Sequence, residues 1–377
     1  MDLQEKVQSA LDAVVEQELE CGCQAALYIN GKLEVNAFAG WTDWSRTKKV
    51  DENTIFPIYS AGKAPCSTAF HRLVERGIVN YDTYVRDFWP EFACNGKENM
   101  QVWHILSYRC GLYIVPTSTE AEQADFWTMT EKMAAARPAY AIGTKQQYHP
   151  VTYGWLVGGM ICHLLGRKNF PQIFKELVAN PAGMDRYYYG AGDEEARNAA
   201  YLVAAKDGSY YDKMGLEWMN KPLFRRCCNP ASCTMSNALS IARHYAALDT
   251  GLLLHRDTIA NAAKPLRSPD DPFEMVKGNW ALFGLGYMLS GPVDDVSRII
   301  GHSGWNGSQG LLDRKRHVAI GFNRNVFANP NASLEAFYKA IDFVDRDWPE
   351  GGAHSSATKV MREGRAPARP PRIARQS

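Results

Sequence analysis

Segments with alternating apolar residues lie near both ends of the chain, and this placement limits the possible folds more than any other feature. Near the N-terminus, two apolar runs flank Asn30 and Gly31, a pair that suits the positive φ angles of a tight hairpin turn. Near the C-terminus, residues 297–305, 308–313 and 317–325 read as consecutive strands. Strands at both ends of one chain predict a single antiparallel sheet to which both ends contribute.

Between these ends, apolar residues recur at helical spacing. Predicted helices cover residues 61–77, 153–165, 170–178 and 238–248. Ser236 or Asn237 is the expected N-cap of the last helix. An amphipathic helix also precedes the hairpin, with an apolar face made by Val7, Leu11, Val14 and Val15. The predicted fold class is therefore α+β, an antiparallel sheet flanked by helices with a mostly helical inserted subdomain.

The chain has 377 residues, enough for one large domain or two intermediate ones. We expect residues 1–75 and 270–348 to form the sheet subdomain and residues 76–269 to form the helical one. Residues 349–377 differ in kind, because from His354 onward they contain six basic residues, one acidic residue and no apolar periodicity. We expect this segment to be a disordered basic tail.

The overall composition excludes several classes of protein. A net charge of +1 gives no electrostatic reason to expect nucleic acid or an acidic membrane as partner. No run approaches the ~18–20 apolar residues of a membrane span, and the N-terminal segment does not read as a secretory signal. Nine cysteines, an odd number, and spacings unlike a zinc site favour reduced thiols in the cytoplasm, with no metal or cofactor. The oligomeric state is unknown at this point.

Three Ser-x-x-Lys sequences occur, starting at Ser45, Ser60 and Ser356. Only Ser60 follows a short apolar run and opens a predicted helix. Residues three apart share a helix face, so Lys63 would lie one turn from Ser60, close enough to exchange a proton. A helix N-terminus also offers unpaired N–H groups to developing negative charge. In the alternative interpretation, Ser60 only caps the helix and the Lys63 side chain is solvated.

Two further segments favour the catalytic interpretation. The first contains Tyr148-His149-Pro150 just before a predicted helix, and the second is Gly-His-Ser-Gly-Trp at residues 301–305. Together with Ser60-x-x-Lys63, they resemble the ordered motifs of the serine β-lactamase-like family. That family includes class C β-lactamases, D,D-peptidases, β-lactamase-fold esterases and fungal acyltransferases such as lovastatin acyltransferase. Its motifs are S-x-x-K, Y-x-N and K-T-G or H-x-G, and the resemblance covers roughly residues 5–345.

The resemblance implies a β-lactamase/transpeptidase-like fold and specific roles for the matching residues. Ser60 would be the acylated nucleophile, Lys63 would share its proton, and Tyr148 would be the base. Free tyrosine has a pKa of ~10, so we expect Lys63 and a protonated His302 to lower the pKa of Tyr148. In the alternative interpretation, Tyr148 is an ordinary half-buried tyrosine and His302 is a core histidine with satisfied hydrogen bonds.

The family also places two backbone N–H groups where the oxyanion forms. By resemblance these belong to Ser60 and Trp305. Ser303 and Gly304, together with His302, would line the strand along which the substrate lies, and Gly304 would allow its close approach.

Several positions depart from the family pattern. Pro150 stands where the family has asparagine, which usually supports the lysine and binds a substrate amide; its absence argues against a penicillin or peptide substrate. Tyr108 and Cys110 replace a usual His and Ser, and residues 229–237 lack the usual paired glycines. We expect Tyr108 and His149 to border an unusual pocket, in which His149 could partly substitute for the missing amide.

The predicted function is that of a serine esterase or acyltransferase acting on an ester or thioester of an apolar small molecule. The proposed setting is the tailoring of a secondary metabolite, with a small-molecule substrate and an acyl carrier or thioester donor as possible partners. Ten Trp and 18 Tyr favour an apolar substrate, and Trp41, Trp44, Trp280 and Trp305 fall in segments that could reach the cleft. Two alternatives are non-hydrolytic acid–base chemistry, such as elimination or cyclisation, and a catalytically inactive binding protein.

Overall fold

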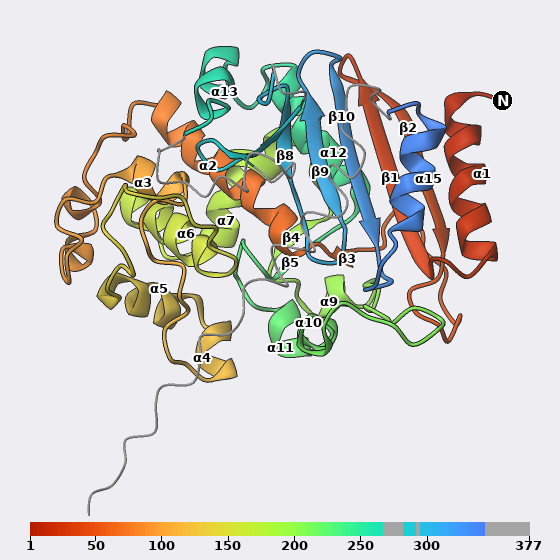
Figure 1. Ribbon diagram of the computed structural model, residues 1–377, viewed down its shortest axis with the longest axis horizontal. Helices are drawn as coiled ribbons and strands as arrows, with labels where there is room; N and C mark the ends of the chain where they lie inside the picture. Colours follow the sequence, from red (N-terminus) through yellow and green to blue (C-terminus); the bar gives the residue numbers. More distant parts are fainter. Residues whose placement is uncertain (267–281, 292–294, 344–377) are drawn as a thin grey trace, which may run out of the picture.

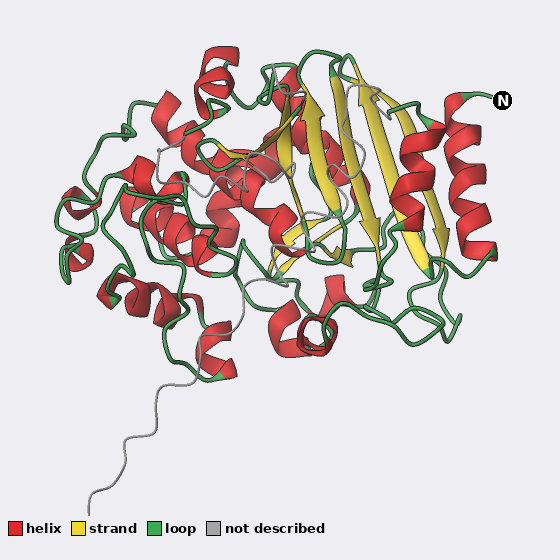
Figure 2. Ribbon diagram, viewed as in Figure 1, coloured by secondary structure: helices red, strands yellow, loops and turns green. Residues whose placement is uncertain are grey.

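The protein is described by a computed structural model over residues 1–266, 282–291 and 295–343. The strands gather in one part of the molecule and most of the helices in the other (Figure 2). This arrangement is the α+β architecture that the sequence predicts. The expected basic tail, residues 349–377, lies outside the described residues, as does the first part of the segment 270–348.

The main sheet has seven antiparallel strands in the order β2-β1-β10-β9-β8-β7-β6 (Figure 1). The strands are β1 (Gly22–Ile29), β2 (Lys32–Gly40), β6 (Leu282–Phe283), β7 (Met288–Ser290), β8 (Ile299–Ser303), β9 (Gln309–Asp313) and β10 (Val318–Arg324). The N-terminal hairpin turns at Asn30 and Gly31, with φ angles of 50° and 76°. Because β1 pairs with β10, both chain ends build one sheet, as predicted.

Helices cover both faces of this sheet. α1 (Leu3–Glu16) and α15 (Ala332–Ala340) lie side by side against one face (Figure 1), and α12 (Ala238–Asp249) packs on the other. Asn237 caps α12, since its side chain accepts from the Ser240 N–H. A Cβ added at Gly321 of β10 would lie 2.0 Å from the Ala238 carbonyl oxygen. Glycine there lets the helix approach the strand closely.

The remaining helices form the second part of the molecule, together with a small sheet in the order β3-β5-β4. The small strands are β3 (Phe56–Pro57), β4 (Tyr187–Tyr189) and β5 (Thr234–Ser236). The helices are α2 (Lys63–Glu75), α3 (Val102–Leu106), α4 (Glu120–Ala124), α5 (Phe126–Ala135), α6 (Thr152–Leu165), α7 (Phe170–Phe174), α8 (Asn180–Ala182), α9 (Asp193–Ala196), α10 (Lys213–Trp218), α11 (Pro222–Arg225) and α13 (Arg256–Ala262). Short 3₁₀ turns occur at Tyr59–Gly62, Val85–Asp87 and Pro90–Phe92, and a π turn at Lys175–Ala179.

α2 and α6 pack together in the largest apolar cluster. The first eleven residues of α6 are buried, which its sequence allows because the helix contains no Asp, Glu, Lys or Arg. The N-terminal ends of the two helices meet, because the carbonyl of Pro150, just before α6, contacts Nζ of Lys63, the first residue of α2, at 2.7 Å. Within the described ranges, no helix is long and apolar enough to cross a bilayer.

Candidate active site

Ser60 lies in the 3₁₀ turn that runs directly into α2. The turn begins at Tyr59, whose φ of 46° is uncommon for a residue with a side chain, and the Tyr59 hydroxyl donates to the Gly215 carbonyl. A Cβ at Gly62 would lie 2.1 Å from Thr234 Oγ1. The turn thus packs tightly against the start of β5, and Ser60 is fixed just before α2.

Three groups surround the Ser60 hydroxyl. Its Oγ lies 2.7 Å from Lys63 Nζ and accepts a hydrogen bond of 2.8 Å from Tyr148 Oη. The Ala231 carbonyl lies 3.2 Å away as an acceptor. The structure therefore brings together Ser60, Lys63 and Tyr148 from two segments 88 residues apart. This geometry suits a serine that passes its proton to a neighbouring base.

Lys63 is fully buried, yet no carboxylate in the described part of the chain contacts its amine. Besides Ser60, its Nζ contacts the carbonyl oxygens of Pro150 at 2.7 Å and Ala231 at 3.0 Å. Burial lowers the pKa of Lys63 well below its usual value, because a buried ammonium loses its hydration. A neutral amine can donate two hydrogen bonds to the carbonyls and direct its lone pair at Ser60.

Tyr148 does not have the lowered pKa that we expected. Burial raises the pKa of Tyr148 above its usual value, and burial also lowers the pKa of His302 well below its usual value. Burial therefore disfavours both cations that a Tyr148 phenolate would need. It favours instead an uncharged lysine, which can accept a proton, beside an uncharged tyrosine, which can donate one.

The predicted substrate strand is the end of β8. The His302 ring lies 5.9 Å from the Tyr148 ring, and its Nδ1 contacts the Ser303 carbonyl at 2.9 Å. A Cβ at Gly304 would lie 2.2 Å from the Ile58 carbonyl oxygen, so the strand end closely approaches the segment that precedes Ser60. His302 and Gly304 are therefore placed beside Tyr148 and the segment that leads into Ser60.

The two predicted oxyanion donors lie on adjoining segments. Ser60 is in the first turn of its helix, where N–H groups have no intrahelical acceptor. The Trp305 N–H donates to no group in the described part of the chain. The Trp305 ring packs instead against Tyr59 and Phe327, with ring centroids 6.0 and 5.4 Å away.

Tyr108 and His149 pack behind Tyr148 and are fully buried. The His149 Nε2 accepts from the Leu112 N–H at 3.1 Å and lies 3.0 Å from Cys110 Sγ, while Nδ1 contacts a backbone carbonyl. Burial lowers the pKa of His149 to about 3. His149 thus ties the Tyr148 loop to the neighbouring loop, and its ring has no atom left to replace the asparagine amide.

The two backbone carbonyls that contact Lys63 could not be found from the sequence. Every residue has a backbone carbonyl, so residue identity could not reveal those of Pro150 and Ala231. The only sequence signal was that positions 150 and 229–237 depart from the family motifs.

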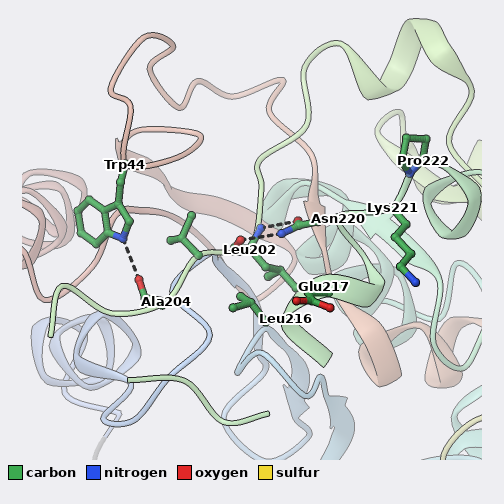
Figure 3. A pocket seen from close by; sticks show the side chains of 9 residues that line it. Trp44, Leu202, Ala204, Leu216, Glu217, Asn220, Lys221 and Pro222 are labelled. Carbon is green, nitrogen blue, oxygen red and sulfur yellow. Dashed lines mark hydrogen bonds between the residues drawn. The ribbon is translucent and has the colours of Figure 1, made fainter. Parts of the chain in front are cut away.

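Trp44, one of the tryptophans in segments that could reach the cleft, lines a separate hollow elsewhere on the surface. Figure 3 shows its indole, whose Nε1 donates to the Ala204 carbonyl at 2.8 Å, at one end of a cavity of about 680 Å³. At the other end lie Lys221 and Pro222. The lining residues are Trp44, Leu202, Val203, Ala204, Leu216, Glu217, Asn220, Lys221 and Pro222. None of the predicted catalytic side chains lines this hollow, and Trp280 lies outside the described residues.

Fold and sequence comparisons define the class of protein as a serine hydrolase of the β-lactamase fold, similar to esterases. The chain belongs to the Beta-lactamase family, which it matches over residues 11–342. It is 27% identical over 341 residues to the Mycobacterium tuberculosis protein Esterase/beta-lactamase LipL, covering 82% of this chain and 78% of that one.

Solved structures agree with this assignment. A family VIII carboxylesterase superimposes with a TM-score of 0.79 at 27% identity, and a penicillin-binding protein homologue from Caulobacter crescentus with 0.77 at 25%. Each comparison covers 90% of this chain and 98% of the other.

Proposed function

We propose that the protein hydrolyses carboxylic esters through an acyl-enzyme on Ser60. The proposal rests chiefly on one observation, that Ser60 Oγ lies 2.7 Å from Lys63 Nζ and 2.8 Å from Tyr148 Oη. A serine hydroxyl needs a base to become a good nucleophile, and a buried neutral amine can take its proton. Similarity to esterases along most of the chain supports the same reaction class.

In the first half-reaction, Lys63 takes the Ser60 proton as Oγ attacks the ester carbonyl. The N–H groups of Ser60 and Trp305 stabilise the resulting oxyanion. Tyr148 then gives its proton to the departing alkoxide as the carbon–oxygen bond breaks. This leaves a Tyr148 phenolate near a Lys63 ammonium, and the Lys63 Nζ lies 4.9 Å from the centre of the Tyr148 ring. Attraction between the two charges stabilises this intermediate.

Water completes the second half-reaction. The Tyr148 phenolate takes one proton from water while the hydroxide attacks the acyl carbon. The acid product forms as the bond to Ser60 Oγ breaks, and Lys63 returns the proton that it took from Ser60. Both side chains recover their initial protonation states. An alcohol in place of water would give acyl transfer through the same steps, and we include transfer in the proposal.

For the substrate we propose an ester or thioester of an apolar small molecule. Pro150 has no side-chain amide to pair with a substrate amide, which supports an ester over a peptide bond. Aromatic rings lie around the nucleophile, since Tyr148 stacks on Phe283 at 5.5 Å and Trp305 lies beside Tyr59. Tailoring of a secondary metabolite, with the acyl group delivered by a thioester or acyl carrier, fits this chemistry.

We also propose a cytoplasmic location. All nine cysteines are free, which supports a reducing compartment.

The test is labelling with a fluorophosphonate, followed by peptide mass spectrometry. We expect one adduct on Ser60, competition by p-nitrophenyl acetate, and no adduct in Ser60→Ala. Turnover of an ester by Ser60→Ala at the wild-type rate would exclude the acyl-enzyme and favour non-covalent acid–base chemistry. Absence of both labelling and turnover in the wild type would favour an inactive binding protein.

A further inference from the structure

The Lys63 amine is held by backbone carbonyls from two separate segments. Pro150 lies just before α6, and Ala231 lies in the loop that leads to β5. A backbone carbonyl oxygen moves with its loop, so the positions of these two oxygens depend on how their loops are held. The direction of the Lys63 lone pair therefore depends on how these two loops are joined.

One side chain joins them. Asn229 is 1% exposed, and its Oδ1 accepts from the Ala231 N–H at 2.8 Å. Its Nδ2 donates to the carbonyl of Val151 at 3.3 Å. Both hydrogen bonds therefore go to the segments whose carbonyls contact Lys63. One is made to Ala231 itself, and the other to Val151, the residue after Pro150. A single amide thus links the two segments.

The packing around Asn229 is specific for this link. A Cβ added at Gly154, in the first turn of α6, would lie 2.2 Å from Asn229 Oδ1 and 2.7 Å from the Ala231 nitrogen. Contacts this short are impossible, so only glycine at 154 permits the helix to reach the Asn229 loop. The close approach of these segments is therefore part of the site.

We propose that Asn229 is a positioning residue for Lys63 and fills the structural role left open by Pro150. This inference rests on the proposed function, because it concerns the base that activates Ser60. The two carbonyls can accept both N–H groups of a neutral Lys63, which leaves its lone pair for the Ser60 proton. If either carbonyl moves, the amine loses an acceptor and, with it, its orientation as a base.

The pH dependence of the reaction reports on Lys63. The titratable groups around its amine are Cys66 on α2, Tyr148 and His149 on the adjoining loop, and His302 on β8. Burial raises the pKa values of Cys66 and Tyr148 and lowers those of both histidines. These shifts favour the uncharged form of all four groups near pH 7, so we expect the acidic limb of the rate profile to report on Lys63.

The test compares Asn229→Ala and the near-isosteric Asn229→Asp with Asn323→Ala. Asn323 is a matched control, because it is also fully buried and donates to a carbonyl, that of Ser236 at 2.8 Å. For Asn229→Ala we expect kcat to fall roughly 10- to 100-fold with KM within about twofold. In Asn229→Asp the new carboxylate favours protonated Lys63, so the acidic limb should move to higher pH. Asn323→Ala should lower Tm and leave that limb in place.

The rate of fluorophosphonate labelling of Ser60 against pH is the second readout. It should fall in both Asn229 variants and keep the wild-type pH dependence in Asn323→Ala. Wild-type labelling rates and an unmoved limb in folded Asn229→Asp would overturn the role of Asn229 alone. If the wild type itself forms no adduct, the proposed function fails and the role of Asn229 fails with it.

Discussion

The Lys63 amine lies 2.7 Å from the backbone carbonyl of Pro150. A main-chain oxygen thus contacts the lysine at the motif position where the resemblance led us to expect an asparagine side chain. Proline lacks both a side-chain hydrogen bond and a backbone N–H, but it keeps its carbonyl. The departure from the family motif therefore leaves the lysine supported.

Replacing Ser60 with alanine should abolish ester hydrolysis. The substitution removes the attacking oxygen, so kcat/KM for p-nitrophenyl acetate should fall by about 10³-fold or more. Cys94→Ser, which alters a thiol that contacts the Ala134 carbonyl at 3.3 Å, is the control and should retain activity. Loss in Ser60→Ala of less than tenfold would show that another group performs the reaction.

Replacing Tyr148 with phenylalanine should have an effect that depends on the leaving group. If Tyr148 protonates the departing alkoxide, an alkyl ester should lose ~10²- to 10⁴-fold in kcat. A p-nitrophenyl ester should lose less kcat, because p-nitrophenolate leaves without taking up a proton. Steady-state kcat values of wild type and Tyr148→Phe for a series of esters with different leaving groups measure this dependence.

Tyr153→Phe is the matched control for that series. It removes a buried hydroxyl that pairs with Ser67 at 2.8 Å, outside the catalytic set. Equal losses for good and poor leaving groups in Tyr148→Phe would contradict an acid role and favour Tyr148 as the base.

The buried lysine also predicts how stability depends on pH. The pKa of Lys63 is lowered in the folded state, whereas in the unfolded chain it is ~10.4. Between these values the unfolded state binds more protons, so the free energy of unfolding rises with pH. Lys63→Met lacks this contribution and should show a smaller rise between neutral pH and about 10. Urea unfolding across this window measures both slopes, and parallel slopes would mean that Lys63 is charged when buried.

Gly321→Ala should destabilise the protein through steric overlap between β10 and α12. Its Cβ would lie 2.0 Å from the Ala238 carbonyl oxygen, and such overpacking costs ~1–3 kcal/mol. Gly208→Ala is the control, because that Cβ would meet nothing within 4 Å although φ is +83°. Thermal unfolding should place Gly321→Ala below Gly208→Ala, and the reverse order would contradict close packing of the helix.

The fold was predictable where local patterns determine it. Asn30 and Gly31 mark their turn because few residue pairs accept two positive φ angles, and the strands near the C-terminus alternate clearly. The predicted helix over 61–77 begins instead with a 3₁₀ turn, and the small sheet of β3, β4 and β5 was not predicted. Strands of two or three residues are too short for periodicity to reveal them.

The site was predictable only as a set of side chains. The motif order pointed to Ser60, Lys63 and Tyr148, and the structure places Lys63 and Tyr148 each within hydrogen-bonding distance of Ser60. The protonation states could not be predicted, because they depend on burial, and burial reverses the expected direction for the pKa of Tyr148. The link through Asn229 was also hidden, since it depends on the approach of loops far apart in sequence.

Rapid acid quenching of the wild-type enzyme during turnover of p-nitrophenyl acetate, followed by peptide mass spectrometry, tests the central claim most directly. An acyl-enzyme mechanism predicts one acetyl group on the peptide that contains Ser60, formed within the first turnover and lost as substrate is exhausted. Sustained turnover with an unmodified Ser60 peptide at every quench time, and no burst of p-nitrophenol, would contradict it.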